Sequence, residues 1–264
     1  MWATMNEVAD PGRLWLDLLS AAPSTGLVPI VLDGLSRQPE RPWDSGELDP
    51  QPAPALDDLD EAVVFKQGWN KGVPLGLLPP SERPPRLRKP GMESRPEPEY
   101  EEDDEEREFF LELVAPWGIT FPGLALEERQ SGDQQTYRQM VIGTASGRLG
   151  LVETNRSADI LHAIGWMGAA NHFISETGAT PLSMMMRSWE DRFGARLFRL
   201  GFDTLVFAVE RPASTGSSAL AIAAEHFAFA GDDGFQAYAD SPVDSMRTLA
   251  AVLLGNPTWR FWFD

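Results

Sequence analysis

The chain has no cysteine. This absence excludes disulfide bonds, catalysis by a thiol and every metal or iron–sulfur site that needs a cysteine ligand. Long apolar runs are also missing: residues 27–32 and 249–254 are far shorter than the about 20 residues that a membrane-spanning helix needs. No basic region precedes an apolar one at the N-terminus, so no signal peptide is expected. These absences predict a cytoplasmic protein without a membrane segment.

Motifs of the common enzyme classes are missing as well. There is no GxxxxGK phosphate loop, no GxGxxG after a strand, no GxSxG turn and no HExxH zinc motif. Positive charge is scarce, because 22 lysines and arginines face 40 acidic residues and the net charge is −18. Nucleic-acid backbones bind clustered Lys and Arg, so no nucleic-acid partner is expected. The acidic balance favours a basic protein partner, with solubility alone as the alternative explanation.

What the chain does contain is typical of a folded protein. Its 264 residues are 42% hydrophobic and include nine tryptophans, enough apolar material for a large core. Thirteen of the 22 prolines lie between residues 39 and 98, and nine acidic residues with one arginine lie within residues 97–108. Both compositions disfavour regular structure. We therefore expect an N-terminal α/β segment (1–78), a proline-rich and acidic linker (79–108) and a C-terminal α+β domain (109–264).

Short signals predict the elements of the N-terminal segment. Asp10 and Pro11 are a typical N-cap and first helical residue, and apolar residues follow them at helical spacing. Residues 27–32 (LVPIVL) predict a buried strand, in which Pro29 indicates a sheet edge or a strand start. Residues 57–67 predict a second helix, because acidic residues fill the first turn, where the helix dipole favours them.

The C-terminal part alternates between predicted strands and helices. The expected strands, rich in β-branched or aromatic residues, are 137–143, 148–153, 195–200, 204–211 and a last one at 259–263. The expected helices, marked by start or stop signals, are 157–164, 180–193, 219–229 and one that begins at residues 241–242. A tight turn at residues 201–203 predicts a hairpin. The fold class is therefore α+β (or α/β): a mixed sheet with a C-terminal hairpin and final strand, covered by amphipathic helices.

Several segments combine rare residues in a fixed order. They are GWMGAAN (165–171), RSWEDRFGARL (187–197), GFDTLVFAVERP (201–212), AAEHFAF (223–229) and WRFWFD (259–264). With them, the chain resembles the family named domain of unknown function 4253, known mostly from actinobacteria. TGLVPIVL (25–32) and RPWDSGEL (41–48) are similar to the N-terminal half of longer members. Members tend to have Cys-Pro after EHFAF, where this chain has Ala230 and Gly231. The resemblance implies no activity, and this difference argues against thiol chemistry.

The helix expected at residues 180–193 carries the first candidate site. Arg187, Glu190 and Asp191 lie on its polar face, away from an apolar stripe that contains Trp189. The arginine precedes the two carboxylates by three and four residues, a spacing that permits weak ion pairs on a solvated helix face. The alternative is that the three residues bind a ligand or a partner peptide, or that the carboxylates act in catalysis.

Glu225 and His226 form the second candidate site. A histidine titrates near neutral pH and a carboxylate can orient it, so both are candidates for acid–base catalysis or binding. Neighbours on a helix point about 100° apart, however, which opposes a direct hydrogen bond. A half-buried, hydrogen-bonded core histidine is the alternative. His226 with His162 and His172 offers three zinc ligands, but their spacing matches no known pattern. No metal and no cofactor is therefore expected.

These observations favour a non-catalytic protein-binding module of an immunity-like or regulatory type, with a basic protein as its partner. The alternative is a hydrolase-type enzyme that uses Glu190, Asp191 or His226 in a cleft between the 180–193 helix and the sheet. The two hypotheses require different geometries. One concave pocket shared by Glu190, Glu225 and His226 favours catalysis, and separate positions of these side chains argue against it.

Overall fold

The computed structural model describes residues 1–35, 37–50, 60–83, 104–129, 132–143, 146–169, 179–238 and 243–263. The strands in these ranges are β1 (Trp2–Ala3), β2 (Val8–Ala9), β3 (Leu27–Leu32), β4 (Ser146–Glu153), β5 (Ala195–Leu200), β6 (Thr204–Val209) and β7 (Thr258–Trp262). The α-helices are α1 (Pro11–Thr25), α2 (Glu61–Gly72), α3 (Asp104–Leu113), α4 (Gln134–Ile142), α5 (Ile160–Ile164), α6 (Thr180–Phe193), α7 (Gly216–Ala230), α8 (Asp233–Gln236) and α9 (Met246–Leu253). Two 3₁₀ turns are η2 (Pro80–Glu82) and η3 (Ser157–Asp159).

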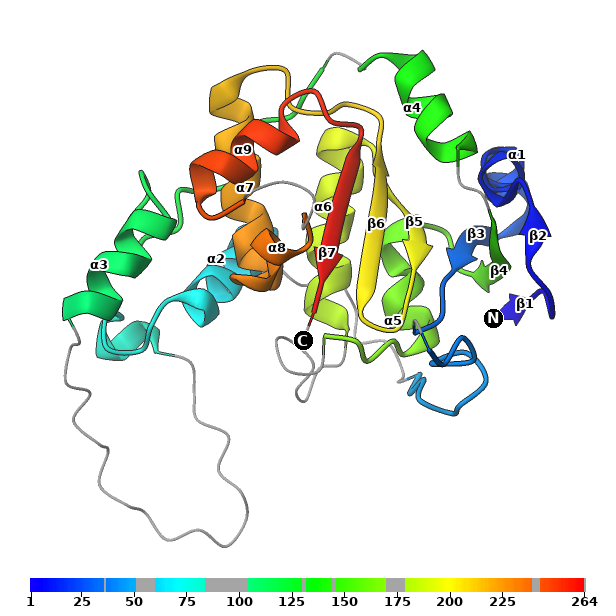
Figure 1. Cartoon of the computed structure of the whole chain (residues 1–264), viewed down its shortest axis with the longest axis horizontal. Helices are drawn as coiled ribbons and strands as arrows, with labels where there is room; N and C mark the ends of the chain where they lie inside the picture. The colour runs from blue at the N-terminus through cyan, green and yellow to red at the C-terminus, as the bar shows by residue number, and fades with distance from the viewer. Residues whose placement is uncertain are drawn as a thin grey trace, which may run out of the picture.

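One mixed sheet organises these elements (Figure 1). Its strand order is β1-β4-β3-β5-β6-β7, and β2 pairs with β4 beside this path. β3 and β5 are parallel, whereas the other pairs are antiparallel. β5 and β6 form the hairpin, and β7 pairs with β6 as the final strand. The expected α+β fold with a mixed sheet, a C-terminal hairpin and a final strand is therefore confirmed.

Helices cover both faces of this sheet and enclose a core on each. The larger core lies under α2, α6, α7 and α9 and contains Trp189, Phe229 and Phe261. The smaller core lies under α1 and α4 and contains Trp15 and Phe198, whose ring centroids are 5.1 Å apart. This two-sided cover agrees with the strand pattern, since successive side chains of a strand point to opposite faces. Among the described residues, no helix has the length and apolar character needed to cross a bilayer.

The N-terminal segment supplies a central strand of the sheet. β3 pairs over its whole length with β4 on one side, and its last two residues pair with β5 on the other. α2 packs against α7, where the rings of Trp69 and Phe227 lie 5.0 Å apart between centroids. Segments 1–78 and 109–264 thus share one sheet and one core. Their division as separate segments stays a prediction.

Residues 137–143, expected as a strand, lie mostly in helix α4 instead. Asp133 caps this helix, because its Oδ1 accepts a hydrogen bond from the backbone N–H of Gln135 at 3.0 Å. The buried side chains of α4 are Tyr137 and Val141, which are four residues apart as on a helix face. The strand prediction was wrong because the short run of β-branched and aromatic residues was read without its N-cap.

Boundaries of other elements also differ from expectation, as in α7, which begins at Gly216 rather than at residue 219. The second helix begins at Glu61, after Asp60, whose Oδ1 accepts from the Ala62 N–H at 2.9 Å. α9 begins after a capping box at Ser245, while residues 241–242, the expected start, lie outside the described residues. The acidic end of the expected linker, residues 104–108, forms the first turns of α3. In this helix the acidic residues of the first turn favour helix formation through the dipole.

Candidate functional site

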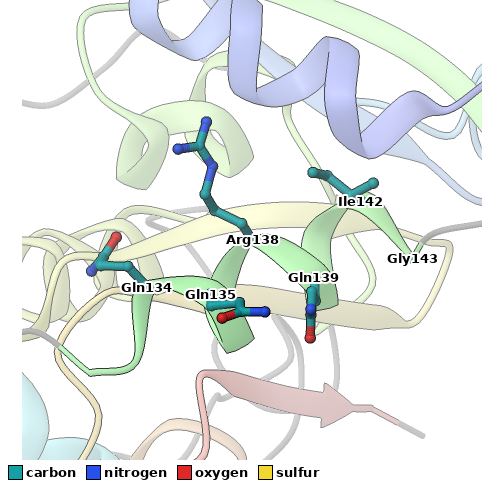
Figure 2. A pocket seen from close by; sticks show the side chains of 6 residues that line it. All are labelled: Gln134, Gln135, Arg138, Gln139, Ile142 and Gly143. Carbon is teal, nitrogen blue, oxygen red and sulfur yellow. The ribbon is translucent and has the colours of Figure 1, made fainter.

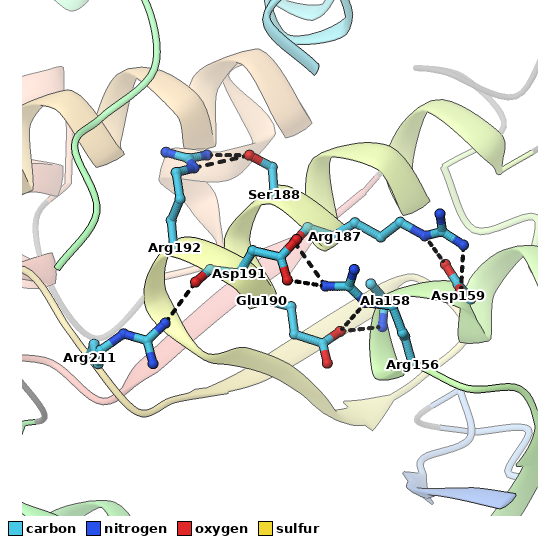
Figure 3. Close-up of polar contacts among 9 residues, drawn as sticks. All are labelled: Arg156, Ala158, Asp159, Arg187, Ser188, Glu190, Asp191, Arg192 and Arg211. Carbon is cyan, nitrogen blue, oxygen red and sulfur yellow. Dashed lines mark hydrogen bonds and ion pairs between the residues drawn. The ribbon is translucent and has the colours of Figure 1, made fainter. Parts of the chain in front are cut away.

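The polar face of α6 is joined by ion pairs to the segment that precedes α5 (Figure 3). Arg187 donates from Nε and Nη2 to the carboxylate of Asp159, at 2.6 and 2.9 Å. Arg156 donates from Nη2 to Asp191 Oδ1 at 2.5 Å. Arginine and carboxylate therefore alternate across this face, which has little net charge. The expected weak pairs within one helix are replaced by pairs between elements.

Glu190 lies among these pairs but has weaker partners. Its side chain is 16% exposed. Oε2 accepts from the Ala158 backbone N–H at 3.2 Å and lies 3.6 Å from Arg156 Nε, too far for a good hydrogen bond. Oε1 has no hydrogen-bond partner within the described ranges. Burial raises the pKa of Glu190 above its ordinary value, and Arg156 offsets this effect only in part.

Glu225 on α7 is fully buried and has a complete set of donors. Oε1 accepts from the Ala125 N–H (2.5 Å) and Arg192 Nη1 (2.7 Å), and Oε2 accepts from Trp189 Nε1 (2.7 Å) and Arg192 Nη2 (2.9 Å). Arg192 also donates to Ser188 Oγ. These bonds tie α6, α7 and the loop after α3 together. The arrangement satisfies a buried charge, as folding requires.

His226 is a core residue without access to solvent. Its ring lies against Trp259, Phe261 and Trp189, at centroid distances of 4.8, 4.7 and 5.4 Å. Neither ring nitrogen has a hydrogen-bond partner among the described residues. Burial lowers the pKa of His226 to about 3, so the ring is neutral near pH 7. The prediction of a core histidine agrees with this position. The predicted histidine was half-buried and hydrogen-bonded, however, whereas His226 is fully buried and has no hydrogen bond to a described residue.

The predicted sites therefore do not converge. Glu225 and His226 have no exposed surface, so they offer no atom to a partner or a substrate, whereas Glu190 lies at a separate, partly open position. His162 Nδ1 lies 3.3 Å from Thr180 Oγ1, and His172 falls outside the described residues. In the ranges that the structure describes, no group of three or more His, Asp or Glu residues is arranged to hold a metal ion.

A pocket opens near Glu190, where β3 and β5 separate. Pro29 of β3 has no N–H, and its carbonyl oxygen accepts from Trp15 Nε1 at 2.9 Å. On β5, the Leu197 N–H donates to Ser157 Oγ at 2.6 Å instead of to a strand. Because side chains occupy these ladder groups, the strands pair only beyond this point. The bonds also explain how Pro29, expected at an edge or a strand start, is accommodated in a central strand.

This pocket has one apolar and one polar wall and a volume of about 410 Å³, within the range of small-molecule sites. The mainly apolar wall comes from α1 and β3 and consists of Leu16, Leu19, Ala22, Pro23 and Val28, with Ser20 as its polar residue. The polar wall comes from the loop after β4, η3, α6 and β5 and consists of Asn155, Arg156, Ser157, Glu190 and Arg196. Sequence reasoning singled out only Glu190 from this set. The two arginines follow no motif, and their contacts arise from tertiary structure.

A second depression lies on the outer side of α4 (Figure 2). It has a volume of about 500 Å³, and its lining runs along the whole of α4 to its C-cap: Gln134, Gln135, Arg138, Gln139, Ile142 and Gly143. Arg138 is the single charged side chain among them. The depression therefore offers no pair of groups for acid–base chemistry and no opposite charges for orienting a ligand.

The fold and these sites define an α+β protein with a charged pocket at a gap in its mixed sheet. Residues 148–264 match the family model described as Domain of unknown function (DUF4253). The expected family is thereby confirmed, and this C-terminal part of the chain belongs to it. The match includes Arg156, Glu190 and Arg196 of the pocket. No curated protein and no solved structure matches the chain. An actinobacterial source stays a prediction.

Proposed function

We propose that the chain is a non-catalytic binding module of an immunity-like or regulatory type, and that α3 binds a basic protein partner. The observation that carries this proposal is an acidic helix face beside an exposed aromatic ring. Asp104, Glu108 and Glu112 repeat every four residues and are exposed, so they share one face. Phe109 lies next to this face and is 67% exposed. Exposed aromatic residues anchor many protein interfaces, and complementary charge speeds association.

The position of α3 supports a role in contact with another molecule. Phe110, one residue after the exposed ring, is buried and packs on Phe227 of α7, with ring centroids 6.1 Å apart. The helix is thereby fixed to the core at one end of the molecule (Figure 1), and its residues Asp104, Glu108 and Glu112 are exposed. A fixed helix loses little conformational entropy on binding.

The α6 residues support the basic-partner hypothesis less well. Glu190 and Asp191 face Arg156, and Asp159 faces Arg187, so their field largely cancels at a distance. A role in partner binding for Arg187, Glu190 and Asp191 stays a prediction. The same proposal includes a cytoplasmic location, which the missing cysteines support, and no nucleic-acid partner, which the net charge of −18 supports.

A charge reversal on α3 tests the proposal. The double variant Glu108→Lys/Glu112→Lys and the single variant Phe109→Ser are compared with Asp17→Lys/Glu127→Lys, a control with the same net charge at other exposed positions. Partners captured from the source lysate are identified and titrated calorimetrically against each purified variant. We expect about tenfold or greater weakening for both α3 variants and wild-type affinity for the control. A partner that binds all four proteins equally contradicts the proposal.

One observation favours the hydrolase alternative. Glu190 has a raised pKa and lines a pocket beside Arg156, a combination typical of general acids and bases. Asp191 fits this role less well because its side chain is 66% exposed and paired with Arg156. Turnover of a panel of p-nitrophenyl esters by the wild type, abolished in Glu190→Gln, would support catalysis. Equal rates for the two proteins, or no turnover, would count against it.

A further inference from the structure

The pocket between α1, β3, β5 and α6 holds charges of both signs that keep unused bonding capacity. Glu190 Oε1 lacks a hydrogen-bond partner among the described residues. Arg156 contacts Glu190 through Nε and Asp191 and the Arg187 carbonyl through Nη2, while its Nη1 takes part in none of these contacts. A guanidinium has five N–H donors, so further acceptors can be bound. The Arg156 side chain is 30% exposed and therefore reachable.

Arg196 adds a second positive group on the same wall. Its Nη1 lies 3.3 Å from Glu210 Oε2, at the long end of the hydrogen-bond range, and its side chain is 31% exposed. It also acts on Glu190 through its charge, which places the two groups in one electrostatic environment. The polar wall therefore presents one carboxylate and two partly exposed guanidinium groups.

This charge pattern restricts the class of ligand. A simple anion would face the Glu190 carboxylate, and a simple cation would face two guanidinium groups, so each meets a like charge. A ligand with both charges on adjacent atoms satisfies the wall without this repulsion. The opposite wall is apolar apart from Ser20, and Leu19, Pro23 and Val28 would be covered by an aliphatic or aromatic group.

We propose that this pocket binds a free, zwitterionic α-amino acid with an apolar side chain. Its ammonium group donates to Glu190 Oε1, its carboxylate accepts from Arg156 and Arg196, and its side chain packs against Leu19 and Pro23 of α1. The pocket volume of about 410 Å³ accommodates a ligand of this size. The burial of Glu190 also supports this assignment. Burial removes water from the carboxylate and raises its pKa, and an ammonium group would replace the lost water contacts with a charged hydrogen bond.

Calorimetric titration of the full chain with matched ligands tests the proposal without any mutation. The probes are leucine, valine, methionine and phenylalanine, followed by N-acetyl-leucine, leucinamide and glycine, which lack in turn the ammonium, the carboxylate and the side chain. We expect at least one of the four apolar amino acids to bind, and each truncated probe to bind about tenfold or more weakly. If none of the four amino acids binds at about 10 mM, the proposal is overturned. Equal binding of N-acetyl-leucine and leucine overturns it as well.

Variants then locate the site. Glu190→Gln and Arg196→Gln should each weaken binding about tenfold or more because a charged hydrogen bond is lost. Leu19→Ala, on the apolar wall, should weaken leucine binding but leave glycine unaffected. Arg138→Gln, in the depression on α4, is the matched control that keeps wild-type affinity. Wild-type affinity in Glu190→Gln and Leu19→Ala would overturn this location. The result is independent of α3, since none of these residues belongs to that helix.

Discussion

Glu190 of α6 and Glu225 of α7 are two carboxylates largely shielded from solvent, and they have opposite surroundings. Glu225 is fully buried and accepts four hydrogen bonds from Arg192, Trp189 and the Ala125 N–H. Glu190 is 16% exposed, and its one hydrogen bond to a described residue is the 3.2 Å contact with the Ala158 N–H. Both side chains lie in a low-dielectric environment, but only one has its charge fully balanced there.

The difference distinguishes a structural charge from a candidate binding charge. A carboxylate with every lone-pair direction used has nothing left for a ligand, and its removal leaves other groups without partners. A carboxylate with a free oxygen beside a pocket retains unused affinity. The number of satisfied bonds at each atom, more than burial alone, therefore indicates which residue is available for function.

The largest effect is expected from Glu225→Gln. This substitution keeps the size of the side chain but leaves Arg192, 13% exposed, without its buried counter-charge. We expect a loss of about 3 kcal/mol in the free energy of unfolding, measured by urea denaturation at pH 7. Glu190→Gln serves as the matched control, with an expected change below about 1 kcal/mol. Equal losses for the two variants would remove the basis of the comparison.

His226 extends the comparison. Like Glu225 it is fully buried and contacts Trp189 of α6, but no charged group is paired with it among the described residues. Its folded-state pKa of about 3 lies below the ordinary 6.5, so the unfolded chain binds more protons between these values. The contribution of the neutral ring to the free energy of unfolding is complete above pH 6.5. It decreases as the pH falls below that value, by up to about 1.4 kcal/mol per pH unit. His226→Leu should flatten this dependence between pH 6.5 and 4 in urea titrations. An unchanged slope would show that the ring is not buried neutral.

Trp189→Phe separates one donor from the rest of the Glu225 network. It removes the 2.7 Å hydrogen bond from Nε1 but leaves Arg192 in place. We expect a loss of about 2 kcal/mol in unfolding free energy. Trp262→Phe is the matched substitution at a half-buried ring, where the Nε1 bond to Asp203 is 3.2 Å and a loss below about 1 kcal/mol is expected. A larger loss for Trp262→Phe would contradict the ranking.

The smallest effect concerns the pH dependence of Glu190. Its folded-state pKa is raised above the ordinary 4.5, so the folded chain binds more protons just above that pH. Stability from this group is therefore present below pH 4.5 and is lost as the pH rises through the folded-state pKa. Relative to Glu190→Gln, the wild type should lose less than about 1 kcal/mol across this window. A wild type that gains stability relative to the variant would show a lowered pKa instead.

Local sequence signals predicted much of the fold. The apolar stripe of α6 with Trp189, and the alternation of Trp259, Phe261 and Phe263 at the C-terminus, give buried side chains as expected. The helix also ends as predicted, at Gly194, with φ 61°. Such signals are reliable because caps, periodicity and glycine conformations depend on neighbours in the chain.

The candidate sites were less predictable because their partners are distant in sequence. Glu225 and Arg192 are separated by 33 residues, and Arg156 and Asp191 by 35. No pattern in the neighbouring sequence predicts which carboxylate forms an ion pair with such a distant arginine. The central place of β3 was missed for a related reason: the indole of Trp15 that covers the Pro29 carbonyl comes from another element. Tertiary pairing decides these questions.

The position of β3 has a consequence for dissecting the protein. The family match begins at residue 148, after β3, yet β3 is the strand that lies between β4 and β5. A fragment of residues 148–264 therefore contains two sheet pieces that no longer share a neighbour, each with an apolar open edge that favours aggregation. A peptide of residues 25–34 would fill that slot by strand complementation. This strand alone would not complete the fragment, because α1, α2 and α4, which supply residues of the two cores, also lie before residue 148. The family segment therefore depends on the N-terminal part of the chain for its central strand and for part of each core.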